Sequence, residues 1–309
     1  MPSFPFVANA VGLFEALARG PATIEDLAKR RGIPRRTMRI LTDAMVALGM
    51  VERKGDRYQN GSIAATFLSG GTLADLRPFL RFWDRVSYPR WTKLEDAIRT
   101  DQVIFEGFTD QEQSIYSAGI EAIIAGIAHA LAATYDFSSH RLVLDLGGGT
   151  GSFLLPILGK YAEVEATLFE LPPVAAIARR RIGASPLAAR IRIVEGDFFK
   201  DPIPDGHDAY IAANILHNLR PDSCLELLHR IRDSAPDGSR LLLPDFWTNA
   251  THTRPPFAAL IAGEFLLTPG GGDIYSVEEG QHWLRECAWR FREHKPLAGP
   301  ASLIVAEAA

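Results

Sequence analysis

Hydrophobic side chains recur every three or four positions over much of the first hundred residues, in short runs that are typical of amphipathic helices. Residues 11–18, 24–30 and 34–48 each carry such a run, and a glycine follows each run within two residues. Thr23 can cap the second helix, because Asp26 stands three residues on and completes a variant of the capping box. We therefore expect three short helices at the N-terminus.

A β-hairpin is expected after the third helix. Residues 50–53 and 57–60 flank a Lys-Gly-Asp turn, and three helices followed by a hairpin form the winged-helix pattern. The helical period then continues through residues 73–98, whose many aromatic side chains we expect to serve mainly as core packing. The pattern predicts an N-terminal, essentially all-helical winged-helix domain over residues 1–98.

The pattern changes near residue 139, where short apolar segments begin to alternate with amphipathic ones. Repeated strand–helix units of this kind predict a parallel, doubly wound sheet that binds ligands at the carboxyl ends of its strands. We assign residues 99–309 to this α/β, Rossmann-like domain. Its expected strands are residues 141–145, 166–170, 191–194, 208–213, 240–244 and 303–306, and its expected helices are residues 111–135, 152–161, 173–182, 221–234 and a last helix that opens at Ser276.

Composition agrees with a globular protein of two domains. The 309 residues are 47% hydrophobic and 23% charged, which excludes disordered and fibrous classes. The net charge is −4, but residues 1–100 hold 16 basic and 10 acidic side chains, while the rest of the chain holds 17 and 27. This asymmetry suggests that the two parts have different tasks.

The cysteines and the N-terminus bear on the cellular compartment. Cys224 and Cys287 cannot build a disulfide framework or a zinc knuckle, so a reducing cytoplasm fits best. The first residues lack the features of a signal peptide, and no uncharged apolar stretch approaches the ~20 residues of a membrane span. His and Cys do not cluster, so no metal is expected. We expect a cytoplasmic protein with no membrane partner.

The clearest candidate site is a glycine-rich turn after the first strand of the α/β domain, Asp145-Leu-Gly-Gly-Gly-Thr-Gly. The turn departs from the dinucleotide pattern Gly-x-Gly-x-x-Gly, because Ser152 stands at the last glycine position. Gly147 and Gly149 let a ligand approach the backbone, and the following helix N-terminus favours an anion. The carboxylate of S-adenosylmethionine (SAM) suits this turn as well as a phosphate does. We therefore assign Asp145, Gly147 and Gly149 to cofactor binding.

The next two strand ends carry residues suited to the rest of such a cofactor. Glu170 ends the second strand, where a carboxylate can accept from both ribose hydroxyls and would repel a 2′-phosphate. After the third strand, the Asp197 carboxylate can accept from an adenine amino group, and the Phe198 ring can stack on the base. Carboxylate, ribose and adenine subsites are thus expected in chain order.

His217 is the candidate general base. It follows the expected strand 208–213, in the cleft region of a doubly wound sheet. Two carboxylates are expected near the same edge, Asp245 at the end of the next strand and Asp273 in a Pro-Gly-Gly-Gly-Asp loop. A carboxylate partner fixes the imidazole tautomer and stabilises the imidazolium. A methyl acceptor deprotonated by His217 would react in line, with no covalent enzyme intermediate.

Taken in this order, the motifs resemble those of the SAM-dependent O-methyltransferases of the winged-helix type, which include plant caffeate-type enzymes and bacterial tailoring enzymes of antibiotic and pigment pathways. The resemblance covers nearly the whole chain. It implies an N-terminal dimerisation domain, a C-terminal SAM-binding domain, His217 as the base, and Asp245 and Asp273 as its supports. The resemblance is carried by residues 13–17 (LFEAL), 26–28 (DLA), 47–51 (ALGMV), 135–137 (YDF), 145–151 (DLGGGTG), 169–172 (FELP), 195–199 (EGDFF), Leu216-His217, Cys224 and 269–271 (PGG).

The layout of that family also indicates where a substrate would bind. If Glu264 faces the pocket, it favours a substrate that carries a hydrogen-bond donor or a positive charge. The alternative is a surface-exposed Glu264. The candidate substrate-binding residues are Phe79, Trp83, Tyr116, Glu264 and Phe265.

The favoured function is methyl transfer from SAM to a hydroxyl of a small aromatic or polyketide-like metabolite by a homodimer, with S-adenosylhomocysteine (SAH) as product. Asn218 and Leu219 replace the Asp-Trp that usually follows the histidine, and Ala213 stands where a basic residue is common. These departures leave open a SAM-binding relative that methylates carbon or nitrogen, or that catalyses hydroxylation, decarboxylation or cyclisation.

A third hypothesis is a DNA-binding regulator with a fused ligand sensor. Its phosphate contacts would come from basic side chains on the winged helix. A solvated basic face is the commoner meaning of such a run, so nucleic acid is the less favoured partner. The side chains are Arg30, Arg31, Arg35, Arg36, Arg39, Arg53 and Lys54.

Overall fold

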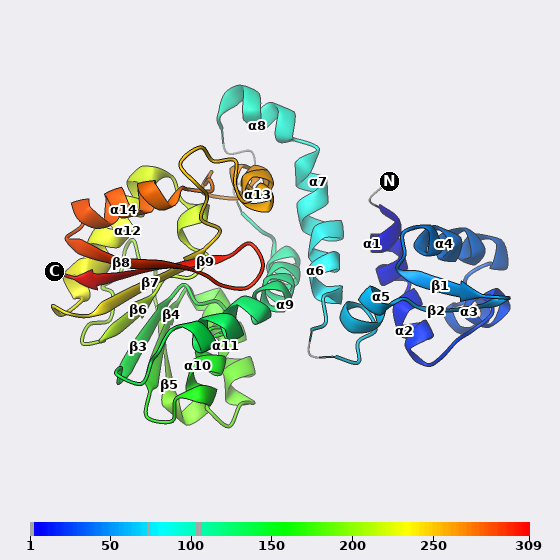
Figure 1. Cartoon of the computed structure of the whole chain (residues 1–309), viewed down its shortest axis with the longest axis horizontal. Coiled ribbons are helices and arrows are strands. Elements are labelled where there is room, and N and C mark those ends of the chain that lie inside the picture. The colour runs from blue at the N-terminus through cyan, green and yellow to red at the C-terminus, as the bar shows by residue number, and fades with distance from the viewer. Residues whose placement is uncertain (1–2, 73, 103–104, 106) are drawn as a thin grey trace. The chain divides into compact units, whose positions relative to one another are not determined.

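The computed structural model describes residues 3–72, 74–102, 105 and 107–309, and Figure 1 labels its elements. The chain forms two compact units. Unit 1 comprises Met1–Arg90 and Phe108–Ile123, and unit 2 comprises Trp91–Gly107 and Ile124–Ala309. The predicted domain boundary after residue 98 falls inside the first segment of unit 2.

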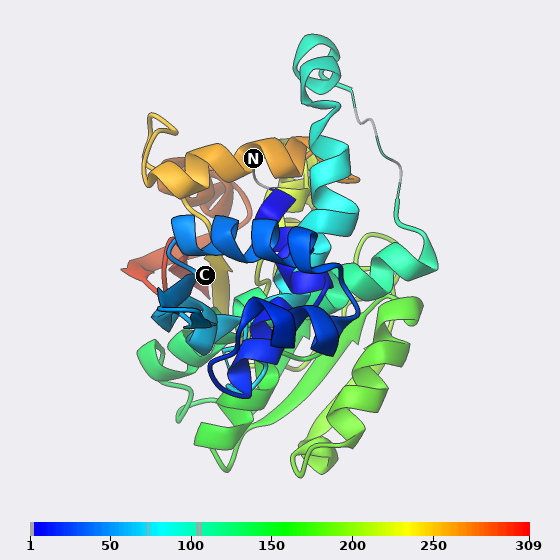
Figure 2. The same cartoon turned by 90° about the vertical axis from the view of Figure 1, so that its right-hand side faces the viewer.

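Unit 1 contains the expected helices and hairpin, with one more helix in front of them. The helix predicted from residue 11 begins at Leu13, after the separate helix α1. The Thr23 hydroxyl accepts from the Asp26 backbone N–H, and the Thr23 N–H donates to the Asp26 carboxylate, so the predicted capping box is present. Helix α4 packs against α1 and α3 around an apolar core (Figure 2). The elements are α1 (Ser3–Ala10), α2 (Leu13–Ala18), α3 (Ile24–Arg31), α4 (Arg35–Ala47), β1 (Val51–Lys54), β2 (Arg57–Asn60) and α5 (Ser62–Phe67).

The aromatic segment after α5 is helical, as its period predicts, and it is divided into four short elements. A π-helical turn interrupts it at Trp83, where one extra residue per turn is accommodated. A second interruption separates α7 from α8. The helical character predicted for residues 73–98 is confirmed from Arg77 to Trp91 and from Leu94 onward, and Leu73 lies outside the described residues. The elements are α6 (Arg77–Phe82), η1 (Trp83–Ser87), α7 (Tyr88–Trp91) and α8 (Leu94–Thr100).

The long helix predicted over residues 111–135 is confirmed as α9 (Asp110–Thr134). Within the described part of the chain, α9 alone is long and apolar enough to cross a membrane by a test that tolerates two charged residues. Core helices of globular proteins pass the same test.

Unit 2 is built on a seven-stranded sheet in the order β5-β4-β3-β6-β7-β9-β8. Strands β3 to β7 are parallel, as predicted, but β9 runs antiparallel to β7 and β8 antiparallel to β9. The expectation of a purely parallel sheet is wrong at this edge, because a short loop joins β8 and β9 as a hairpin. The strands are β3 (Leu142–Leu146), β4 (Glu165–Glu170), β5 (Ile191–Glu195), β6 (Ala209–Ile211), β7 (Arg240–Asp245), β8 (Trp289–Pro296) and β9 (Ser302–Ala308).

Helices cover both faces of this sheet. Successive strand residues point to opposite faces, so Val143 packs with α9, α10 and α11, while Leu144 packs with α12 and α14. The sheet is therefore doubly wound, and the parallel strands all end at one edge. The remaining elements are α10 (Leu154–Lys160), α11 (Pro172–Gly183), η2 (Ala188–Arg190), η3 (Leu216–Asn218), α12 (Pro221–Ser234), α13 (Pro256–Leu267) and α14 (Val277–Glu286).

Candidate active site

The glycine-rich turn after β3 requires its glycines. Gly147 and Gly149 both have φ of 59°, a left-handed conformation that favours glycine. A Cβ on Gly148 would lie 2.2 Å from Asp145 Oδ2, and one on Gly147 would lie 2.7 Å from Ile215 Cδ1. A side chain at either position would collide with Asp145 or Ile215, so glycine is required and the turn leaves its own backbone without side-chain cover.

Two buried carboxylates lie beside the turn. Asp145 is fully buried, and both its carboxylate oxygens lack a hydrogen-bond partner among the described residues. Glu170 accepts from the Gly149 and Leu171 backbone N–H groups, each at 2.8 Å. Burial raises the pKa of Asp145 well above its usual value, with the Glu170 charge as a second cause, and burial also raises the pKa of Glu170. Such carboxylates favour a ligand that brings hydrogen-bond donors or positive charge.

Phe198 reaches the turn, while Asp197 has another partner. The Phe198 ring would lie 3.4 Å from a Cβ on Gly147. The Asp197 carboxylate accepts from Lys200 Nζ at 2.8 Å and from the Phe199 N–H at 2.9 Å. The Lys200 hydrogen bond is the main reason why the pKa of Asp197 is lowered. The adenine contact of Asp197 stays a prediction. For that contact, the adenine amino group would have to share the Asp197 carboxylate with Lys200.

The predicted base lies beyond the carboxyl end of β6, in η3. His217 is 5% exposed, and its Nδ1 lies 2.5 Å from Asp245 Oδ1 at the end of β7. The same oxygen accepts from the Phe246 N–H at 2.7 Å. Because a carboxylate accepts, Nδ1 carries the proton of this bond, and in the neutral imidazole Nε2 then keeps a lone pair. The structure thus brings together two of the three predicted catalytic residues.

Asp273 is placed differently from Asp245. Its loop does pack on the His217 segment, since a Cβ on Gly272 would lie 2.0 Å from the His217 carbonyl oxygen. The Asp273 side chain itself is exposed and accepts from the Ile274 N–H at 2.6 Å. Its supporting role stays a prediction.

Sequence reasoning missed the aromatic surroundings of His217. The Phe265 ring stacks on the His217 imidazole with ring centroids 3.9 Å apart, and the Phe246 ring does so at 5.9 Å. Phe265 was expected to line a substrate pocket, and here it packs on the imidazole. The one feature of the sequence that could have placed Phe246 near His217 is its position directly after Asp245.

Glu264 is buried, which excludes the alternative of a surface-exposed side chain. Its side chain is 7% exposed and accepts from Trp91 Nε1 at 2.5 Å within unit 2. The other three candidate substrate residues belong to unit 1, where Phe79 packs on Trp83 and Phe82 packs on Tyr116. The substrate-binding roles of all five residues stay predictions.

The basic side chains of the winged helix are mostly engaged within unit 1. Arg30 and Arg31 donate to backbone carbonyls, and Arg35 pairs with Glu25. Arg39 pairs with Asp43. These contacts do not favour a DNA-binding face. In the part of the chain that the structure describes, no group of three or more His, Cys, Asp or Glu side chains could hold a metal ion.

Comparison with known proteins gives the class. Residues 91–279 match the O-methyltransferase domain, and residues 2–70 match the O-methyltransferase dimerisation domain. The chain therefore belongs to the O-methyltransferase family, as the motifs predicted, and it is an enzyme of that class with a dimerisation domain at its N-terminus.

Individual relatives agree with this assignment. The 3-hydroxy-5-methyl-1-naphthoate 3-O-methyltransferase of Streptomyces sahachiroi is 32% identical over 89% of this chain and 82% of its own length. Two solved structures are similar over 99% of this chain. PigF with SAH has a TM-score of 0.89 at 27% identity and 95% coverage of its chain, and the mitomycin 7-O-methyltransferase MmcR has 0.86 at 28% identity and 93% coverage. The predicted SAM/SAH cofactor agrees with the first of these structures.

Proposed function

We propose that this enzyme transfers the methyl group of SAM to a hydroxyl of a small aromatic or polyketide-like metabolite, with His217 as general base. The observation that carries the proposal is the buried His217–Asp245 pair at the carboxyl edge of the parallel sheet. This pairing leaves Nε2 of a fixed tautomer as the proton acceptor.

The glycine-rich turn and its carboxylates fit SAM. The unpartnered oxygens of Asp145 suit the donors at the methionine end, Glu170 suits the ribose hydroxyls, and Phe198 offers a ring face for the adenine. When bound, SAM supplies an electrophilic methyl group on a sulfonium. The burial of Asp145 and Glu170 strengthens their attraction to donors and to positive charge.

The proton of the acceptor hydroxyl passes to His217 Nε2. As the imidazole gains that proton it becomes an imidazolium, and the Asp245 carboxylate beside Nδ1 stabilises the new charge. The loop at Gly272 and the rings of Phe246 and Phe265 pack around the histidine and restrict its movement. The protein therefore contributes orientation and proton removal.

Relatives support the substrate class and the assembly. Their names specify a hydroxynaphthoate, tetracenomycin polyketide synthesis and mitomycin biosynthesis as their contexts of O-methylation. The match to a dimerisation domain supports a homodimer. Both cysteines are free and buried, which agrees with a reducing, cytoplasmic setting. Light scattering on the purified enzyme should give twice the 33.9 kDa mass of the chain.

Calorimetric titration with SAM and SAH, followed by a screen of phenolic acceptors, tests the proposal. We expect micromolar binding of both ligands and a methylated product from at least one phenol. His217→Ala should lower kcat by about 100-fold or more while SAM affinity stays within about threefold. A well-folded protein that binds neither ligand would overturn the donor, and near-normal turnover by His217→Ala would overturn the base.

A further inference from the structure

Three consecutive residues of α13 connect the general base with the segment Trp91–Gly107. The Glu264 carboxylate accepts from the indole N–H of Trp91 at 2.5 Å. Phe265, the next residue, stacks its ring on the His217 imidazole at a centroid distance of 3.9 Å and an interplanar angle of 29°. Gly263, the residue before, faces the Trp91 ring.

The geometry points to a new role for this connection. We propose that Trp91 and Glu264 are positioning residues, which hold α13 in the place where Phe265 orients the His217 ring. The proposal rests on the proposed function, because it assigns a purpose to the orientation of the proposed base.

Gly263 shows that Trp91 lies tightly on the helix. A Cβ on Gly263 would lie 3.0 Å from Trp91 Cη2 and 3.3 Å from Cζ3, which is closer than most real Cβ contacts. The glycine therefore lets the indole approach the α13 backbone, and this approach brings Nε1 to the Glu264 carboxylate. The packing on Gly263 and the hydrogen bond to Glu264 thus both hold the Trp91 side chain against α13.

The hydrogen bond is strong enough to matter. Glu264 is 7% exposed, so its carboxyl group is largely removed from water, and a hydrogen bond is electrostatically stronger in such surroundings than in water. Removal of either partner would leave a buried polar group without this bond, which costs more than an exposed bond would. Because α13 is a continuous helix from Pro256 to Leu267, a shift at Glu264 also moves Phe265.

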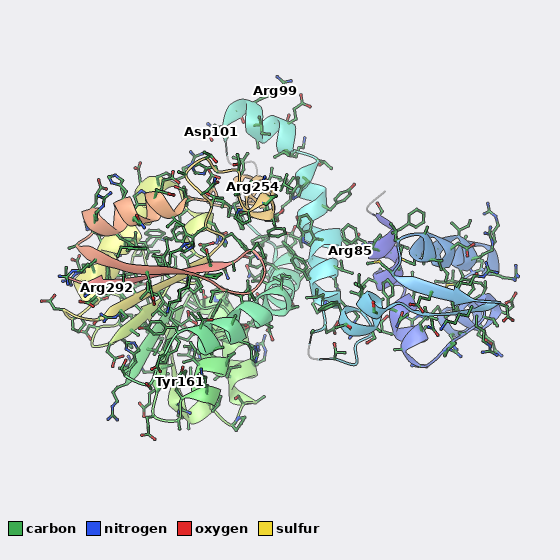
Figure 3. The ribbon with its side chains drawn as sticks, in the orientation of Figure 1. Arg85, Arg99, Asp101, Tyr161, Arg254 and Arg292 are labelled. Atoms are coloured by element: carbon green, nitrogen blue, oxygen red, sulfur yellow. The ribbon has the colours of Figure 1, made fainter. Side chains whose placement is uncertain are left out.

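A second contact docks the other end of the Trp91 segment near the base. Arg220 Nη2 donates to the Asp101 carbonyl oxygen at 3.1 Å, and Asp101 lies at the end of α8, where Figure 3 labels it. Arg220 follows η3, the turn that carries His217, by two residues. Residues 91–101 are thus joined to the surroundings of His217 at both ends, and the Trp91 contact is the buried one.

Steady-state kinetics with four variants test the proposal. Trp91→Phe keeps a ring but removes the N–H, and Glu264→Met removes the acceptor. Each should lower kcat roughly 10- to 100-fold, the effect expected when a catalytic group is slightly misplaced, with SAM affinity within about threefold. Glu264→Gln keeps an acceptor oxygen and should recover most of the kcat lost in Glu264→Met. The matched control is Trp289→Phe, which removes the indole donor of another buried bond, to the Leu228 carbonyl, and should leave kcat within about threefold.

A double-mutant cycle separates positioning from general destabilisation. If Trp91 and Glu264 act through one bond, the double variant Trp91→Phe/Glu264→Met should be no slower than the slower single variant. Additive losses, or a Glu264→Gln variant as slow as Glu264→Met, would overturn the proposal.

A readout independent of methyl transfer keeps the two proposals distinguishable. The enzyme is labelled with ¹³C at histidine Cε1, and the His217 signal is identified by its loss in His217→Ala. An imidazole proton over a phenyl face resonates upfield, so this signal should move downfield in Trp91→Phe and Glu264→Met but not in Trp289→Phe. An unmoved signal in both variants overturns the positioning role. Failure of the wild type to methylate any acceptor, with the shift still seen, contradicts only the proposed function.

Discussion

The Asp245→Asn substitution isolates the charge beside His217, the proposed general base. Asp245 Oδ1 accepts both from His217 Nδ1 at 2.5 Å and from the Phe246 N–H at 2.7 Å. The amide oxygen of asparagine can occupy the same place and keep both bonds. What disappears is the negative charge that stabilises the imidazolium formed when His217 takes the proton.

The magnitude follows from burial. Both side chains are about one-twentieth exposed, so solvent screens the pair little. A hydrogen bond to a charged group contributes about 1.5–3 kcal/mol, and a loss of that size in the transition state lowers kcat roughly 10- to 150-fold. Substrate and SAM binding should change far less, because the charge on His217 develops only as the acceptor is deprotonated.

The assay measures SAH release under saturating SAM, with the phenolic acceptor found in the screen. Asp136→Asn is the matched control, since the Asp136 side chain is exposed and accepts from the Ser138 N–H at 2.9 Å. It should leave kcat within about threefold of wild type. The reasoning would be refuted by an Asp245→Asn enzyme within about threefold of wild type, or by a larger loss in Asp136→Asn.

Two other predictions concern the glycine-rich turn. Gly148→Ala should weaken SAM binding about tenfold or more in calorimetry, because the new Cβ would lie 2.2 Å from Asp145 Oδ2 and overpacking of this kind costs about 1–3 kcal/mol. The control Gly159→Ala, whose new Cβ would have no atom within 4 Å, should bind SAM normally. Equal SAM affinities of the two variants would contradict the steric argument. Asp145→Asn should raise the melting temperature of the ligand-free enzyme relative to wild type, and the gain should grow as the pH rises above about 4. The sign follows because a carboxyl whose pKa is raised by folding holds its proton more tightly in the folded state, so it destabilises the fold increasingly as the pH rises through the interval between the unfolded and folded pKa values. Scanning fluorimetry from pH 5 to 8 checks this prediction. A difference in melting temperature between variant and wild type that shrinks as the pH rises would contradict it. The same variant should bind SAM more weakly than wild type.

Local features of the sequence predicted much of the molecule. The capping box at Thr23 could be predicted because Thr23 and Asp26 stand only three residues apart. The glycine-rich turn could also be predicted, because its residues are adjacent in the sequence. The pairing of His217 with Asp245 was expected because both follow the carboxyl ends of strands that the sheet makes neighbours.

Some elements could not be predicted because their pattern is weak. Strand β8 lies at the edge of the sheet, and its alternating buried and exposed residues include several charges in place of an apolar run. The π-helical turn that begins at Trp83 leaves the hydrophobic period nearly intact, so no pattern in the sequence indicates it.

The sequence by itself determined the two-part organisation, the glycine-rich turn and the identity of the candidate base, because periodicity and short-range spacing carry that information. Only the tertiary structure decided what surrounds His217. The bond from Trp91 to Glu264 joins residues 173 positions apart, and the stacking of Phe265 on His217 depends on how α13 packs. Asp273 lies in the predicted loop, yet its side chain turns to Ile274. Such contacts arise from close packing of distant segments, which no local pattern along the chain records.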